Sequence, residues 1–124
     1  MARLPEIVQK AWAARNCPPT LTTVGSDGVP NSVYVTNVAL LDAGTIAVAD
    51  GAFCKTRANI LNGSKGVFLF LTEAAAYQIK GRFEYHTDGP VMDAAKNWAD
   101  FTWPVHGIAL LKVEEVYNGA EKLA

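Results

Sequence analysis

The sequence has few of the residues from which small proteins build catalytic or metal centres. Its two cysteines, Cys17 and Cys54, and its two histidines, His86 and His106, lie outside any metal-ligand spacing. No GxSxG, GxxxxGK[ST] or GxGxxG pattern occurs. These absences argue against a hydrolase triad, a zinc site, a P-loop and a Rossmann turn. Two isolated thiols are typical of a reduced, cytoplasmic protein.

The chain also lacks a dominant charge and a long apolar run. Eleven basic and twelve acidic residues give a net charge of −1, too little for a diffuse basic field that could hold nucleic acid or an anionic membrane. The first residues include Arg3, Glu6 and Lys10, unlike a signal peptide, and the apolar run 67–71 is too short to cross a bilayer. We therefore expect a cytoplasmic protein with no nucleic-acid or membrane partner, which holds any anion in a local site.

Half of the 124 residues are apolar, and their spacing predicts a mainly β fold. Apolar residues at helical spacing predict helices within 4–12, 55–61 and 91–99. β-rich runs between turn residues predict strands over 20–24, 29–41, 45–49, 66–71, 74–85 and 107–117. Without a regular βαβ alternation, these elements favour an antiparallel barrel with two to three short helices, in a single domain spanning 1–124.

The segment around Lys55 and Thr56 is the strongest candidate for an anion site. Cations at the start of a helix, such as Lys55 and Arg57, are unfavourable beside the positive end of the helix dipole. A bound phosphate would reverse that sign and would contact backbone N–H groups, the Lys55 ammonium and the Thr56 hydroxyl together. The alternative is an ordinary surface turn with two solvated cations.

Two further segments contain residues that suit a ligand site. Asn31 and Ser32 are poor strand formers at the start of a strand-like run, where they could contact a ligand or simply follow a hairpin turn. Trp103 lies beside Pro104, where its ring could cover a planar ligand or a partner subunit, or pack in the core. Because the chain has an anion site but no evident nucleophile or metal cage, we expect a borrowed cofactor to supply the chemistry.

The order of the motifs resembles the FMN-binding split-barrel family, the superfamily of pyridoxamine 5′-phosphate oxidase, and within it the small bacterial FMN-binding proteins. The resemblance extends from about residue 19 to residue 116. It is based on PNSVY at 30–34, LLD at 40–42, IAVAD at 46–50, KTxxN at 55–59, IKGR at 79–82 and TDGP at 87–90. It implies a six-stranded antiparallel Greek-key split barrel that forms a homodimer, with FMN bound at two sites between the subunits.

The resemblance also implies which residues hold the phosphate end of FMN. Lys55 and Thr56 would bind the phosphate, and Asn31 and Ser32 would add phosphate or ribityl contacts. The clustered basic and tyrosine residues with which vitamin B6 oxidases bind their substrate have no counterpart in this sequence. The resemblance therefore implies the cofactor without implying vitamin B6 oxidation.

A second group of residues would surround the flavin ring if the resemblance holds. Trp103 would reach the flavin from the other subunit. The residues expected along the ring are Val33 and Tyr34, and those expected at its edge are Ala47, Val48, Ala49 and Asp50. Together with Trp103, the apolar strand residues would shield the flavin ring.

We therefore expect an FMN-binding flavoprotein that transfers electrons or acts as a small flavin-dependent reductase with an unidentified redox partner. One alternative is an oxidoreductase that uses deazaflavin or haem in the same barrel, with His86 or His106 as the candidate haem ligand. Another is a cofactor-free dimeric binding domain, in which apolar aromatics form the interface and Lys55 is a solvated charge.

Overall fold

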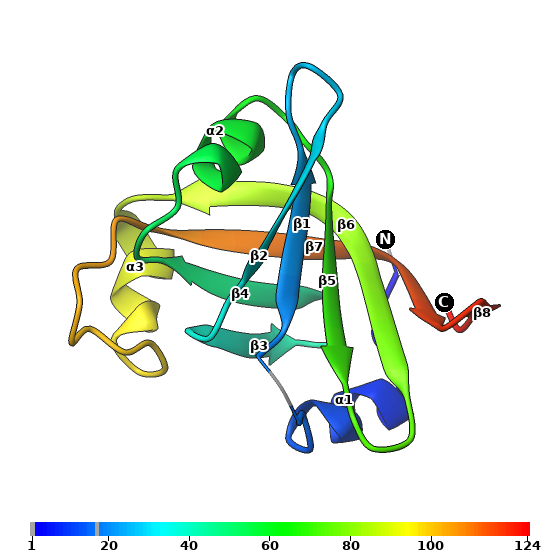
Figure 1. Cartoon of the computed structure of the whole chain (residues 1–124). Helices are drawn as coiled ribbons and strands as arrows, with labels where there is room; N and C mark the ends of the chain where they lie inside the picture. Colours follow the sequence, from blue (N-terminus) through cyan, green and yellow to red (C-terminus); the bar gives the residue numbers. More distant parts are fainter. Residues whose placement is uncertain (1, 17) are drawn as a thin grey trace.

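A computed structural model describes residues 2–16 and 18–124, and it confirms a mainly β protein with three short helices (Figure 1). The helices are α1 (Glu6–Trp12), α2 (Lys55–Leu61) and α3 (Gly89–Ala95). The strands are β1 (Thr20–Val24), β2 (Pro30–Tyr34), β3 (Val38–Asp42), β4 (Thr45–Asp50), β5 (Gly66–Leu71), β6 (Ala76–His86), β7 (Gly107–Asn118) and β8 (Glu121–Lys122). In the described part of the chain, none of the helices has the length and apolarity needed to span a membrane.

The strands form one antiparallel sheet in the order β2-β1-β5-β6-β7-β4-β3, and β8 pairs with the end of β7. In Figure 1, β1, β2 and β5 cross in front of β3 and β4, and the long strands β6 and β7 connect these two halves of the sheet. No ladder joins the end strands β2 and β3 within the described residues, so the curved sheet is not closed. The expected Greek-key path stays a prediction.

The run 29–41, predicted as one strand, is divided into β2 and β3. The Val35 N–H donates to the carbonyl oxygen of Pro19 at 2.9 Å, and the Asn37 carbonyl oxygen accepts from the Ala49 N–H at 2.8 Å. The chain thus leaves β1 and joins β4 within three residues, and no glycine or proline marks that bend. Together with the short polar β8, this division gives eight described strands where six were predicted.

The main core lies between the two halves of the sheet. It contains Leu21, Phe68 and Ile79 from one half and Ile46 and Leu111 from the other, all fully buried. Burial of such side chains contributes about 1.5–3 kcal/mol each, which makes this core the principal source of stability. The core also explains the alternation of buried positions along β1 and β5.

Strand β4 is buried on both faces, which explains its continuous apolar sequence. Ile46 and Val48 face the main core, whereas Ala47 and Ala49 belong to a second cluster with Ala95 of α3. The small alanine side chains face the helix and the larger side chains fill the core. This packing fixes the position of β4, whose end borders the cavity described below.

A candidate cofactor cavity

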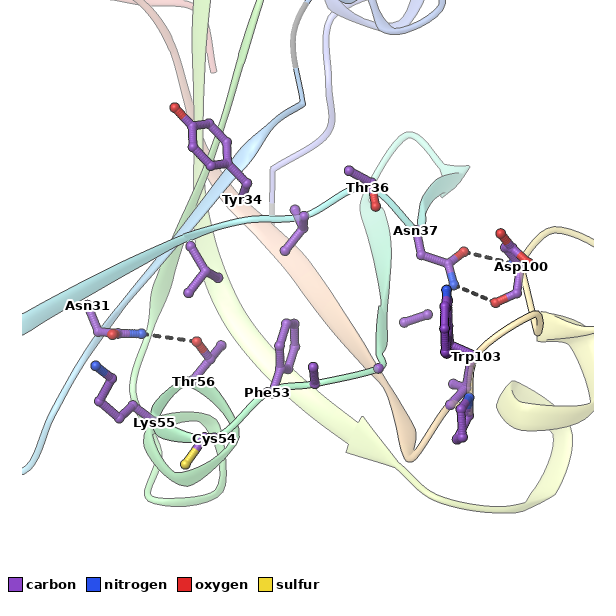
Figure 2. A pocket seen from close by; sticks show the side chains of 17 residues that line it. Asn31, Tyr34, Thr36, Asn37, Phe53, Cys54, Lys55, Thr56, Asp100 and Trp103 are labelled. Carbon is purple, nitrogen blue, oxygen red and sulfur yellow. Dashed lines mark hydrogen bonds between the residues drawn. The ribbon is translucent and has the colours of Figure 1, made fainter.

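A cavity of about 920 Å³ lies where the end of β2, the start of α2 and the segment before β7 meet (Figure 2). Its volume falls within the range of about 300–1,000 Å³ that is usual for small-molecule sites. The lining consists of residues 31, 33–37, 49, 51–56, 100 and 103–105. One site is therefore assembled from segments far apart in the sequence.

One end of the cavity is rich in hydrogen-bond donors and carries a positive charge. The Asn31 Nδ2 donates to the Thr56 Oγ1 at 3.0 Å, and Thr56 is buried. Its hydroxyl hydrogen remains available for a second acceptor. Lys55 is exposed and forms no ion pair with any described residue. An ammonium, a hydroxyl and an amide at one place are suited to a phosphate or another anion.

The rest of the cavity is lined by aromatic and apolar groups. Figure 2 shows Phe53 between the Lys55 end and the Trp103 end. Tyr34 and Trp103 are 75% and 77% exposed although both are large aromatic residues. Exposed aromatic rings beside a cavity are available to a ligand or to another protein surface.

Asn37 and Asp100 face each other at the Trp103 end. The Asn37 Nδ2 donates to the Asp100 carbonyl oxygen, and the Asn37 Oδ1 accepts from the Asp100 N–H, both at 2.9 Å. Hydrogen bonds from the Thr102 side chain and from the Thr102 N–H, which donates to the Asp100 Oδ1 at 2.8 Å, lower the pKa of that exposed carboxyl group. The segment leading to Trp103 is thus ordered by polar contacts.

Asp50 supports the loop that forms the cavity floor. Its fully buried carboxylate accepts from the Phe53 N–H at 2.9 Å, from the Arg57 Nε at 2.6 Å and Nη2 at 3.0 Å, and from the Tyr85 hydroxyl. The carboxylate therefore holds Phe53, a lining residue, against β4 and β6.

The acidity of these groups follows from their contacts. Burial raises the pKa of Asp50, but the hydrogen bonds from Arg57, Tyr85 and Phe53 outweigh burial, so the pKa lies below its ordinary value. The hydrogen bond to Asp50 raises the pKa of Arg57. Burial and the bond to Asp50 raise the pKa of Tyr85 to about 12. At neutral pH the cluster is a buried ion pair with a neutral tyrosine.

Most of the residues singled out in the sequence meet at this cavity. Those that line it are Asn31, Val33, Tyr34, Ala49, Lys55, Thr56 and Trp103. Trp103 lines the cavity that its own chain forms. Ser32 does not line the cavity, and its hydroxyl lies 2.6 Å from the Thr22 Oγ1.

Three further candidates lie beside the cavity and do not line it. Ala47 and Val48 are inside the two apolar clusters on either face of β4. The Asp50 side chain is directed to Arg57 and Tyr85, so its role is to support the loop through Phe53. The motif IAVAD thus describes a doubly buried strand that ends at the cavity.

Phe53, Asn37 and Asp100 line the cavity but were not among the residues expected there. Phe53 belongs to the same short segment as Lys55, so its proximity to that lysine was a usable signal. Asn37 and Asp100 are 63 positions apart, and no local pattern in the sequence links them.

Neither histidine lines the cavity. The His86 Nε2 is 3.2 Å from the Glu84 Oε1, and His106 is exposed after the lining segment. Across the described ranges, no group of three or more His, Cys, Asp or Glu side chains could hold a metal ion. Tyr34 and Cys54 do line the cavity, and both side-chain types serve as haem ligands in proteins.

Comparison with known proteins gives a consistent family and fold. The family model for pyridoxamine 5′-phosphate oxidase matches residues 8–117. An uncharacterized protein from Methanocaldococcus jannaschii is 33% identical over 107 residues, which represent 79% of this chain and 70% of that protein. The crystal structure of HupZ from Group A Streptococcus is 25% identical, covers 98% of both chains and has a TM-score of 0.83.

Other solved structures of this fold are named for different cofactors. An FMN-binding protein from Syntrophomonas wolfei is 23% identical, covers 91% of this chain and 95% of its own, and has a TM-score of 0.72. A haem-binding protein from Mycobacterium smegmatis is 18% identical, covers 94% and 54%, and has a TM-score of 0.69. An F420 reductase is 15% identical, covers 84% and 91%, and has a TM-score of 0.64. At these identities the likeness shows the fold alone.

Proposed function

The chain belongs to the pyridoxamine 5′-phosphate oxidase family, and on that basis we propose that it is an FMN-binding flavoprotein that transfers electrons or acts as a small flavin-dependent reductase. The observation that supports FMN is the division of one cavity into a cationic, donor-rich end and an aromatic end. A phosphate fits the first end and a planar ring fits the second.

The residues at the cationic end would bind and orient the phosphate. Lys55 has no ion-pair partner in the described chain, so a phosphate would compensate its charge without breaking an existing contact. The Thr56 hydroxyl and the Asn31 amide would add hydrogen bonds from one side. Hydrogen bonds to a charged group contribute about 1.5–3 kcal/mol each, enough to fix the orientation of the ligand.

The aromatic end would exclude water from the ring. The Phe53 N–H donates to the Asp50 carboxylate, and Trp103 is an exposed lining residue. When bound, FMN would supply the redox chemistry, while the chain supplies binding, orientation and a shielded environment. This division of labour is consistent with a lining that offers an exposed thiol, Cys54, but no paired acid and base.

We also propose that the protein acts as a homodimer in which a second copy covers the open side of each cavity. The exposed rings of Tyr34 and Trp103 support this proposal, because both lie on the lining and are left uncovered by their own chain. A dimer would also cover the free edge of β2, which pairs only with β1 among the described strands.

Haem or a deazaflavin in the same cavity is the second candidate. Solved structures of this fold include a haem-binding protein and an F420 reductase. In this chain, the lining residues Tyr34 and Cys54 are of types that serve as haem ligands. The histidines first considered as haem ligands are outside the lining, so Tyr34 and Cys54 are the candidate haem ligands that this chain places there.

The absorption spectrum of the untreated purified protein tests this assignment. We expect a flavin spectrum, or its appearance after added FMN is bound; a haem spectrum would establish the alternative, and a colourless protein that binds no FMN would exclude the proposed function. Anaerobic titration with NADH and NADPH then separates the two roles. Direct bleaching indicates a reductase, whereas bleaching only by dithionite or a protein donor indicates an electron carrier.

A further inference from the structure

The segment that carries Trp103 is joined to the rest of the molecule by the side chain of Asn37. Its Nδ2 donates to the Asp100 carbonyl oxygen and its Oδ1 accepts from the Asp100 N–H, both at 2.9 Å (Figure 2). Within the described part of the chain, no other hydrogen bond connects residues 100–105 to another segment. These two hydrogen bonds between Asn37 and Asp100, called the tie below, therefore form the polar connection of this segment to the rest of the molecule.

Packing holds the two ends of this segment. Ala99, which precedes it, and Val105 both contact the apolar cluster beneath α3, and His106 donates its N–H to the Asp50 carbonyl oxygen at 2.7 Å. Trp103 itself is 77% exposed, so no core contact fixes its ring. Between the two packed ends, the hydrogen bonds at Asp100 are thus the contact that joins the part of the segment carrying this ring to the β4 side of the cavity.

Asn37 suits this task because its amide group has one donor side and one acceptor side, like a peptide unit. It pairs with the Asp100 main chain as a neighbouring strand would. The Asn37 carbonyl oxygen accepts from the Ala49 N–H at 2.8 Å, which fixes Asn37 to β4. Asn37 thus connects the β4 wall of the cavity to the segment of Trp103.

We propose that Asn37 is a positioning residue, which holds the Trp103 segment in its binding position and thereby sets the affinity of the cavity for the ring of its ligand. This inference rests on the proposed FMN site. A segment that is already ordered loses less conformational entropy when a ligand binds, so the tie increases affinity. Because Asn37 acts at the ring end, its loss weakens FMN and riboflavin by the same factor.

Hydrogen exchange at the Asp100 amide, followed by NMR, tests the tie without any ligand. In Asn37→Ala this amide should exchange about tenfold faster, the size expected for the loss of two hydrogen bonds. Asn97→Ala is the matched control and should leave this exchange rate unchanged, because Asn97 is an exposed asparagine outside the cavity lining. An unchanged exchange rate in Asn37→Ala would overturn the proposal.

Binding of FMN and riboflavin, measured by quenching of flavin fluorescence, tests the consequence. Asn37→Ala should raise both dissociation constants about tenfold. In a protein that already carries Trp103→Ala, the same substitution should cause no further increase in either dissociation constant. If Asn37→Ala weakened the binding of FMN alone, or weakened flavin binding tenfold again in the Trp103→Ala protein, Asn37 would act on the ligand directly. Either result would overturn its role as a positioning residue. A wild type that binds neither flavin overturns the proposed function, whereas normal flavin binding by Asn37→Ala overturns only the role of Asn37.

Asn37→Asp provides a second variant should Asn37→Ala fail to fold. It keeps an acceptor for the Asp100 N–H and loses the donor to the Asp100 carbonyl oxygen. We expect the Asp100 amide to stay protected while riboflavin, which carries no phosphate for the new carboxylate to repel, binds more weakly than to the wild type. Riboflavin binding equal to that of the wild type would contradict the inference.

Discussion

At the scale of single residues, Lys55 lines the cavity with a positive charge that forms no ion pair among the described residues. We predict that Lys55→Met weakens FMN by about 10–100-fold, as expected for one lost charge-assisted hydrogen bond, and leaves riboflavin nearly unchanged. Only FMN carries the phosphate. Titration of both flavins measures the difference.

Lys10→Met is the control for a general change in charge, since Lys10 is exposed on α1 and pairs only with Glu6 among the described residues. It should bind both flavins like the wild type. If Lys55→Met weakened FMN and riboflavin equally, the assignment of Lys55 to the phosphate would be wrong.

Asp50 is predicted to be important for stability rather than for direct ligand contact. Asp50→Asn would leave Arg57 without its carboxylate partner. We expect the free energy of unfolding in urea to fall by about 2–4 kcal/mol. This is less than for a fully buried pair, because the Arg57 side chain is 33% exposed to solvent. Asp93→Asn, on the exposed side of α3, should change stability by less than about 0.5 kcal/mol. Equal effects of the two variants would contradict the role of the Asp50 cluster.

The same cluster predicts a pH dependence of stability. The pKa of Asp50 is lowered in the folded state, so its contribution is present above about pH 3.9 and is lost as the pH falls through the folded value. The pKa of Tyr85 is raised to about 12, so the unfolded state releases its proton first and stability falls as the pH rises above about 10.

Urea midpoints of the wild type and Tyr85→Phe across the alkaline range isolate the tyrosine, because the other groups titrate in both proteins. The difference between the two midpoints should shrink as the pH approaches 12. A constant difference would mean that Tyr85 does not titrate differently in the folded and unfolded states.

At the scale of elements, Gly81 determines how β6 passes β7. The register shifts between Lys80 and Gly81, and a Cβ at Gly81 would overlap the carbonyl oxygen of Lys112. We predict that Gly81→Ala destabilises the fold by at least about 2 kcal/mol in urea unfolding. Gly51→Ala is the control, since its Cβ would meet no atom closer than 3.7 Å, and a similar loss there would remove the steric explanation.

Local elements were predictable because their signals lie within a few residues. The bounds of α2, β1 and β5 match the predicted ranges, since each is an apolar pattern bounded by turn residues. The bend at 35–37 was not predictable, because its hydrogen bonds join Val35 to Pro19 and Asn37 to Ala49. Long-range partners, not local propensity, divide that run.

In the candidate site, too, residues with a local signal could be predicted from the sequence, whereas contacts between distant segments could not. Lys55 and Thr56 could be singled out because cations at a helix start are locally unfavourable. Asp50 was expected at the edge of the flavin ring, but the sequence does not show that its carboxylate binds Arg57 and Tyr85 instead. The partnership of Asn37 and Asp100 depends on the folded arrangement of two loops.

At the scale of the whole molecule, the proposed dimer predicts a mass of twice the 13.3 kDa chain in light scattering at micromolar concentration. Tyr34→Glu places a charge among the exposed rings and should shift the population to monomer, because burying an unpaired carboxylate is costly. Glu in place of Ile7, which is 63% exposed on α1, is the matched control and should leave the mass unchanged. A monomeric wild type would exclude the dimer.

The pairing of strands that are distant in the sequence also has a consequence for folding kinetics. β1 pairs with β5, and β4 with β7, so distant segments must meet before the cavity exists, and such topologies fold slowly. A ligand of the finished cavity would therefore have no binding site in the transition state. In stopped-flow experiments, saturating FMN should slow unfolding and leave the refolding rate unchanged, so that the cofactor lengthens the lifetime of the native state without guiding its formation.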